Sequence, residues 1–143
     1  MPGYGELATL KEIVSQVAME VGIAQTDVTL VIASTDQDIR QMHALLSAVA
    51  AEVLTEEPYQ TTLGDGIWIA DRDGVPQTGW TADDNVVLFE RRLAVNGLKW
   101  RFLQAKGLEF GEAMRDFTTR LNKLAAQANA RVLDLDLDGG RWL

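Results

Sequence analysis

Apolar residues recur every three to four positions along four stretches of the chain, which is the spacing of one face of an α-helix. The first predicted helix runs from about Leu10 to Val21, and Gly22 ends it. Thr9 and Glu12 fit a capping box, in which side chain and backbone satisfy each other's unpaired groups. The N-terminal part of the chain is therefore expected to be helical.

A second apolar-periodic stretch starts after Ser34 or Thr35. Ser34 and Gln37 again fit a capping box. Pro58 limits this helix to about Glu56, because the residue before a proline is disfavoured in the helical region. A second capped helix is therefore expected here.

Two further helices are predicted over 83–106 and 109–131, joined by a short connection at Gly107 that makes them an antiparallel hairpin. A glycine inside a helix costs about 1 kcal/mol relative to alanine, so we expect a close helix contact at Gly97. The apolar surface of the third helix is wide. It suggests burial on more than one side, within the fold or against a neighbouring subunit.

Glycines and prolines punctuate residues 57–82, which separate the second and third predicted helices. Residues 67–69 are strand-like, and 71–74 (Asp-Arg-Asp-Gly) is a turn signal, so a small hairpin is expected on a projecting loop. The whole pattern predicts an all-α fold, a four-helix bundle-like subunit with a short β-hairpin loop and an extended C-terminal tail.

The final segment, 133–143, changes to strict alternation of leucine and aspartate, which is typical of a strand. We therefore divide the chain into a helical domain, 1–132, and an extended tail. An unpaired strand leaves its backbone groups to water or to another chain. The alternative, in which the tail folds back on its own subunit, stays open. The tail residues expected to contact a partner are Leu133, Asp134, Leu135, Asp136, Leu137, Gly139, Gly140, Arg141, Trp142 and Leu143.

Composition narrows the function classes. The chain has 143 residues, 47% of them hydrophobic, and a formal net charge of −8. This size suits one domain with a real core, and the acidic balance argues against a protein that coats nucleic acid. There is no cysteine, and the N-terminus lacks a signal-peptide pattern. No apolar run approaches the ~18 residues that cross a bilayer, so a soluble protein made in the cytoplasm is expected.

Residue types that carry catalysis are scarce. His43 is the single histidine and has no ligand set around it in the sequence. No phosphate-binding glycine loop occurs, and the spacing of residues 71–74 is wrong for a calcium loop. Arg91 and Arg92 could contact phosphate, but such pairs on a helix are usually solvated or salt-bridged. We therefore expect no enzyme, no cofactor and no metal site.

The order of these features resembles the order found in a known protein family. A capped helix ends at Val21-Gly22, an apolar approach leads into Ser34–Gln41 (STDQDIRQ), and a second helix follows with Leu45-Leu46. An irregular loop, a helical pair and a tail complete the layout. This arrangement resembles the head-to-tail adaptor proteins of tailed bacteriophages, also called head-completion or neck proteins.

The resemblance implies a structural virion protein that is located in the phage neck and made in the host bacterial cytoplasm. Such subunits form a dodecameric ring under the portal protein, extend the DNA channel and provide a platform for the stopper or tail protein. DNA would then be only passing cargo, and no membrane is involved. The tail residues named above would bind the portal. Contacts with neighbouring subunits or the next neck protein would fall on Trp68, Asp71, Arg72, Asp73, Trp80, Trp100 and Phe102.

A second class of function remains open from the sequence. A small soluble helical binding module, such as a regulator or an antitoxin-like protein, could use the same C-terminal tail to inhibit a target. Size separates the two possibilities, because an adaptor forms rings and a regulator stays small.

Overall fold

The computed structural model describes residues 7–23, 30–56 and 66–142, and for 128–142 it describes the backbone. Helices and an antiparallel sheet are both present, so the fold is a mixture of α and β, and the all-α prediction is wrong. The helices described are α1 (Leu10–Glu20), α2 (Gln37–Val53), α4 (Arg91–Ala105) and α5 (Gly111–Trp142). The strands described are β1 (Ala8–Thr9), β2 (Ile69–Ala70), β3 (Pro76–Gln77) and β4 (Val86–Val87).

The sheet joins segments that are far apart in the sequence. Its strand order is β1-β4-β2-β3, and every neighbouring pair is antiparallel. Val87 of β4 lies opposite Ala8 on one side and Ile69 on the other. Each strand is only two residues long, which is too short for a visible period-two pattern. The β2–β3 pair is the hairpin predicted for the middle of the chain.

The start of α1 matches its prediction. The backbone N–H of Glu12 donates to Thr9 Oγ1 at 3.2 Å, and the backbone N–H of Thr9 donates to Glu12 Oε1 at 3.0 Å. The second of these bonds lowers the pKa of the Glu12 carboxyl because it stabilises the charged form. The capping box therefore sets the point where β1 turns into α1.

The start of α2 differs from the prediction. Asp36, rather than Ser34, is the N-cap, and its Oδ1 accepts hydrogen bonds from the backbone N–H groups of Asp38 and Ile39 at 2.9 and 3.1 Å. Ser34 instead accepts from the backbone N–H of Asp36 at 3.1 Å. The Ser34 capping box is therefore wrong, because the Asp36 carboxylate, two residues closer to the helix, accepts from the unpaired donors of its first turn.

The predicted third helix begins too early. Its first residues form a turn and β4, and α4 starts at Arg91. The carboxylate of Asp83 accepts from the backbone N–H groups of Val31 and Ile32, both at 2.9 Å, so it ties two loops together rather than starting a helix. Asn85 Oδ1 accepts from the N–H of Thr81 at 2.8 Å. These bonds hold the turn from which β4 enters the sheet.

The core lies around α4, which contacts α1, α2 and α5. The close approach expected at Gly97 is confirmed. A Cβ atom there would meet Val49 Cγ1 at 2.7 Å and Phe117 Cε1 at 2.9 Å. Both neighbours are fully buried. The absence of a side chain at Gly97 therefore allows α2 and α5 to pack closely on α4.

The long helix α5 corrects the predicted tail. Gly107 ends the preceding helix region with φ +72°, as expected for a glycine after a helix. The backbone then stays helical from Gly111 to Trp142, so the extended segment 133–143 is wrong where it is described, and Leu143 lies outside the described residues. Extending an existing helix needs no new nucleus. The alternation also places Leu133 and Leu137 four residues apart, a spacing that is compatible with one side of a helix.

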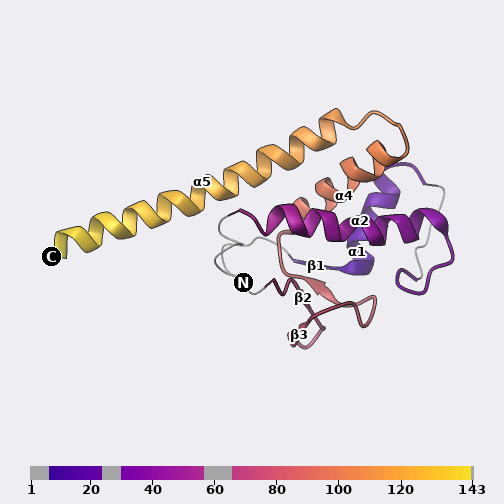
Figure 1. Cartoon of the computed structure of the whole chain (residues 1–143), viewed down its shortest axis with the longest axis horizontal. Helices are drawn as coiled ribbons and strands as arrows, with labels where there is room; N and C mark the ends of the chain where they lie inside the picture. Colours follow the sequence, from indigo (N-terminus) through magenta and orange to yellow (C-terminus); the bar gives the residue numbers. More distant parts are fainter. Residues whose placement is uncertain (1–6, 24–29, 57–65, 143) are drawn as a thin grey trace.

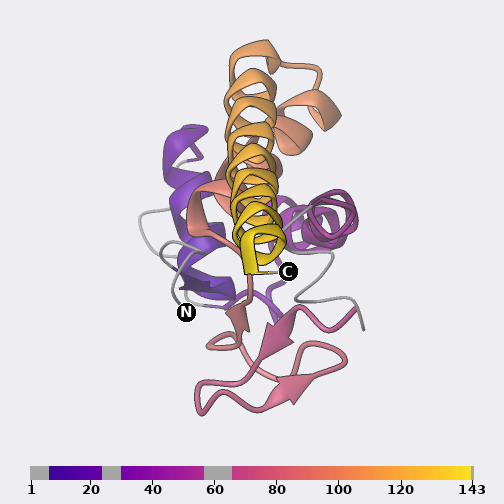
Figure 2. The same cartoon turned by 90° about the vertical axis from the view of Figure 1, so that its left-hand side faces the viewer.

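The overall shape is a body with one projecting helix. Figure 1 shows α5 running along the body and then beyond it, so that its yellow C-terminal end lies well past every other labelled element. Figure 2 looks at this end almost along the helix axis. In both views the β2–β3 hairpin lies on the side of the body opposite the connection between α4 and α5. None of the described helices is long and apolar enough to cross a bilayer.

Candidate interaction surfaces

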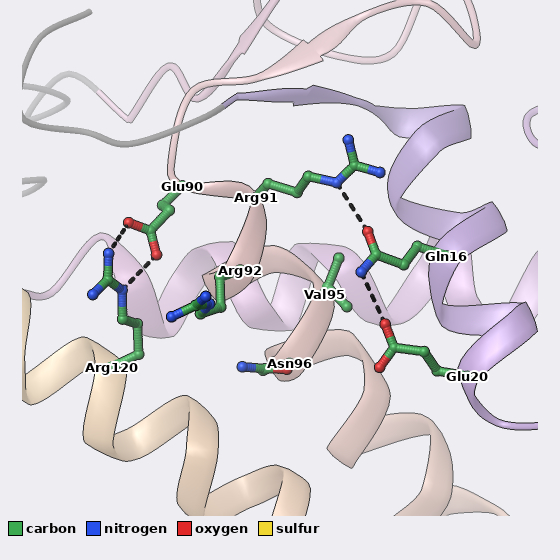
Figure 3. A pocket seen from close by; sticks show the side chains of 8 residues that line it. All are labelled: Gln16, Glu20, Glu90, Arg91, Arg92, Val95, Asn96 and Arg120. Carbon is green, nitrogen blue, oxygen red and sulfur yellow. Dashed lines mark hydrogen bonds and ion pairs between the residues drawn. The ribbon is translucent and has the colours of Figure 1, made fainter.

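A pocket of about 490 Å³ opens where the N-terminus of α4 meets α1 and α5. Figure 3 shows its two rims, with Glu90 and Arg120 on one side and Arg91, Gln16 and Glu20 on the other. The lining is almost entirely polar, and Val95 is its single apolar member. The pocket is therefore suited to charged groups rather than to an apolar ligand.

An ion pair forms the first rim. Arg120 of α5 donates from Nε and Nη2 to the two carboxylate oxygens of Glu90, at 2.6 and 2.5 Å. The Glu90 side chain is 6% exposed and that of Arg120 is 25% exposed. Glu90 precedes the first residue of α4. This two-point pair therefore connects the start of α4 to the middle of α5.

A chain of polar contacts forms the second rim. Arg91 Nε donates to Gln16 Oε1 at 2.9 Å, and its guanidinium lies 3.5 Å from Glu12. Gln16 in turn donates to Glu20 at 2.9 Å, and Lys99 lies 3.2 Å from the same carboxylate. The expectation of a salt-bridged Arg91 is confirmed, and the network connects α1 to α4.

A second hollow of about 420 Å³ adjoins the pocket and shares Arg92, Asn96 and Arg120 with it. Arg92 and Asn96 extend from α4 toward the side on which Arg120 lies (Figure 3). The rest of the lining comes from one stretch of α5, namely Arg115, Asp116, Thr119 and Lys123. We call this surface the α4–α5 basic groove, defined by Arg92, Asn96, Arg115, Thr119, Arg120 and Lys123. Sequence analysis considered only Arg92 of this set.

The aromatic residues predicted to make contacts come together on another side. The rings of Trp68 and Trp80 meet edge to face with centroids 5.3 Å apart, and Phe89 lies 6.1 Å from Trp68. His43 of α2 lies 5.5 Å from Trp80. Both tryptophans are partly buried and pack against the core. The cluster therefore attaches the sheet to α2, and it leaves part of each indole at the surface.

The predicted turn is present between β2 and β3. The side chain of Asp71 accepts from the backbone N–H groups of Asp73 and Val75 at 2.9 Å each, and Gly74 has φ +87°. Arg72 lies 3.7 Å from Asp84, and both side chains are at least half exposed. Residues 71–73 therefore form a well-defined turn at the end of the hairpin, where a partner could reach them.

Trp100 and Phe102 are placed differently from each other. Phe102 is 3% exposed and belongs to the core, so it offers little surface to another chain. Trp100 is partly buried, and its ring lies 6.1 Å from that of Phe110 and 4.4 Å from the Arg101 guanidinium carbon. Of the two, Trp100 alone keeps surface for a neighbour. The residues expected to bind the portal lie on the helical C-terminal part of α5, apart from Leu143.

Within residues 7–23, 30–56 and 66–127, no group of three or more His, Asp or Glu side chains could hold a metal ion. No protein-family model, curated protein or solved structure matches the chain. The geometry alone defines three candidate surfaces: the basic groove, the aromatic cluster with its hairpin, and the projecting part of α5.

The position of His43 predicts a pH dependence of stability. Burial lowers the pKa of His43, and the smaller effect of Asp83 raises it. Its Nε2 atom is buried and has no hydrogen-bond partner among the described residues. The folded chain therefore binds this proton less readily than the unfolded chain. The free energy of unfolding should fall as the pH drops below about 6.5, the ordinary histidine value.

The measurement is urea denaturation at several pH values between 7.5 and 5. His43 is the only histidine, so the difference between the wild type and His43→Gln isolates its contribution. This difference should shrink as the pH falls, because only the wild type takes up the extra proton on unfolding. Parallel curves for the two proteins would show that His43 does not titrate differently in the folded state.

Proposed function

We propose that this chain is a non-enzymatic assembly protein of tailed bacteriophages, the head-to-tail adaptor that forms a ring beneath the portal in the virion neck. The observation that supports this most strongly is α5, which continues past the body that its first half helps to build (Figure 1). The layout of the sequence, which resembles such adaptors, supplies the class of partner.

The length of α5 is the basis of the argument. Its 32 residues span about 48 Å at 1.5 Å per residue. Four residues in its first half are buried against the body, namely Ala113, Phe117, Leu121 and Leu124. The same three-to-four spacing continues in the sequence through positions 128, 132, 135, 139 and 142. An apolar stripe on a helix that leaves its own body is best explained by a partner that covers it.

Under this proposal, each of the remaining surfaces contacts a different partner in the ring. The portal would take the projecting part of α5 as a helix, rather than as the added strand expected from the sequence. The β2–β3 hairpin, with Trp68 and Trp80 beside it, would face neighbouring subunits or the stopper or tail protein. With a net charge of −8 per chain, the ring would let DNA pass without holding its phosphates.

Native mass spectrometry and negative-stain electron microscopy test the ring. The purified chain, alone or mixed with the portal protein encoded in the same genome, should form closed rings with a mass of twelve 15.7 kDa chains. A chain that stays monomeric at all concentrations and does not bind that portal protein would contradict the proposal. It would favour the alternative, a small binding module that acts through its C-terminal segment.

Truncation tests the role of the projecting helix. A chain that ends at residue 132 keeps every α5 side chain that the structure describes as buried in the body, and the last of these is Leu124. It should therefore retain its thermal stability and nearly all of its helical circular dichroism, but it should no longer bind the portal. A buried tryptophan anchor contributes on the order of 2 kcal/mol or more, and a ring multiplies such contacts. Normal portal binding by the truncated chain would place the docking surface elsewhere.

A further inference from the structure

The α4–α5 basic groove gathers positive charge on a chain whose net charge is −8. On α4, Arg92 and Asn96 are four residues apart. On α5, the same interval separates Arg115, Thr119 and Lys123. Residues four apart lie on one side of a helix, so each helix contributes one row of cations and hydrogen-bonding groups to the hollow between them. The groove therefore has the chemistry to bind anionic groups.

Three cations of the groove are available to a ligand. The side chains of Arg92, Arg115 and Lys123 are exposed. They form no ion pair or hydrogen bond with any part of the chain that the structure describes. Asp116 is the single acid among the residues that line the 420 Å³ hollow. The groove therefore offers net positive charge to an anion from outside the chain.

The residue types in the groove favour phosphate over other anions. Arginine, lysine, threonine and asparagine side chains are among the groups that donate hydrogen bonds to the phosphate oxygens of nucleic acids. An acidic protein segment fits less well, because protein interfaces are anchored by apolar or aromatic side chains and every residue that lines the 420 Å³ hollow is polar or charged. A single strand would likewise need aromatic side chains on which its bases could stack. The backbone of a duplex needs neither.

The length of the groove fits a short run of phosphates. Arg115 and Lys123 are separated by about 12 Å along the axis of α5, at 1.5 Å per residue. Successive phosphates of one DNA strand advance about 3.4 Å along the duplex axis. A strand that lies along α5 would therefore pass about three phosphates between these two cations, with Arg92 extending from α4 on the other side of the hollow (Figure 3).

We propose that the α4–α5 basic groove binds the phosphate backbone of duplex DNA through Arg92, Arg115 and Lys123. Contacts of this kind position a protein on the duplex and carry no information about base sequence. The inference goes beyond the proposed function, which assigns no surface of the chain to DNA, and it does not depend on the ring. If the chain does form that ring, the groove marks the surface that faces the channel.

The acidic balance of the chain limits the strength of this contact. The net charge of −8 repels the same phosphates that the groove attracts. Three cations also neutralise only about three phosphates, so binding should be measurable at low salt and weak at physiological salt. The groove would therefore guide a passing duplex without holding it.

The salt dependence of duplex binding tests the groove. A short, fluorescently labelled duplex is titrated with the purified chain, and fluorescence anisotropy gives the association constant at several NaCl concentrations. Three phosphate contacts should give a log–log slope of about −2.7, which is a fall of about fortyfold between about 50 and 200 mM salt. Arg115→Gln with Lys123→Gln should weaken binding by roughly tenfold or more at the lower salt and bring the slope to about −1.

Two matched variants separate the groove from the overall charge. Lys11→Gln with Arg40→Gln makes the same change in net charge on α1 and α2, away from the groove, and both side chains are exposed. Arg115→Lys with Lys123→Arg keeps both charges inside the groove. Each of these variants should bind the duplex with the slope of the wild type, and circular dichroism should show every variant folded.

Three results would overturn the inference. The first is a wild-type chain that does not bind the duplex even at low salt. The second is an unchanged slope in the variant with Arg115→Gln and Lys123→Gln. The third comes from competition: if poly-glutamate displaces the labelled duplex as well as unlabelled duplex does, the groove binds acidic protein segments rather than phosphates.

The proposed function and this inference fail separately. Rings that form from a chain that does not bind the duplex would leave the adaptor standing and remove the DNA contact. Duplex binding through the groove by a chain that forms no ring, alone or with the portal, would leave the DNA contact standing and remove the adaptor.

Discussion

Replacing Gly97 with valine should lower the free energy of unfolding by about 3 kcal/mol, which is a large part of the stability of a domain of this size. A Cβ atom at this position would lie 2.7 Å from Val49 Cγ1 and 2.9 Å from Phe117 Cε1. Both neighbours are fully buried and cannot move aside without disturbing α2 or α5. Alanine should cost less, because its better helix propensity returns about 1 kcal/mol.

The measurement is urea denaturation followed by circular dichroism, with two controls. Gly79→Ala adds a Cβ atom where no atom lies within 4 Å, so it should leave stability nearly unchanged. Phe117→Leu should be destabilising alone, but it should cost less in the Gly97→Ala background because the two changes share one contact. Additive effects, or a Gly97→Val chain as stable as the wild type, would show that the three helices can separate at little cost.

Replacing Arg120 with methionine should destabilise the fold by about 3 kcal/mol, because it removes the two-point ion pair of the buried Glu90 carboxylate. The Glu90 side chain is 6% exposed and accepts both hydrogen bonds of the pair. The reverse change, Glu90→Gln, should cost less, since the Arg120 side chain is 25% exposed and water can solvate it. The order of the two losses is therefore part of the prediction.

The double variant Arg120→Met with Glu90→Leu provides the control. Removing both charges leaves no buried charge at this site, so the double variant should be more stable than Arg120→Met alone. Thermal and urea denaturation of the wild type, Arg120→Met, Glu90→Leu and the double variant complete the cycle. If Arg120→Met and Glu90→Gln lose equal stability, or if the double variant is the least stable, the buried pair does not have the role that its geometry indicates.

Local signals predicted the fold well where one short segment contained the whole signal. The Thr9–Glu12 capping box placed the start of α1 correctly, and Gly107 correctly separated the last two helices. The close helix contact at Gly97 was also predicted, from the cost of a glycine inside a helix. In each case the deciding interaction joins residues within one turn, or follows from one residue's own conformational cost.

The prediction was wrong where a local pattern in the sequence was compatible with two structures. The alternation of 133–138 suits a strand, but its leucines four apart are also compatible with a helix, and extending α5 requires no new helix nucleus. Asp83 suits a helix start, but its carboxylate instead binds the backbone N–H groups of Val31 and Ile32, some fifty positions earlier. No short segment of the sequence therefore shows which of these two roles Asp83 takes.

The sequence by itself determined where the four described helices lie, apart from the start of α4 and the end of α5, together with the hairpin turn at 71–74 and the acidic balance. Each of these depends on neighbouring residues or on composition alone. Only the tertiary structure decided the sheet, because its two-residue strands carry no pattern of their own and β1 pairs with β4, more than seventy positions later in the sequence. The basic groove likewise exists only in the tertiary structure. Arg92 and Lys123 are 31 positions apart, and their rows of charge border one hollow only because α4 and α5 pack together.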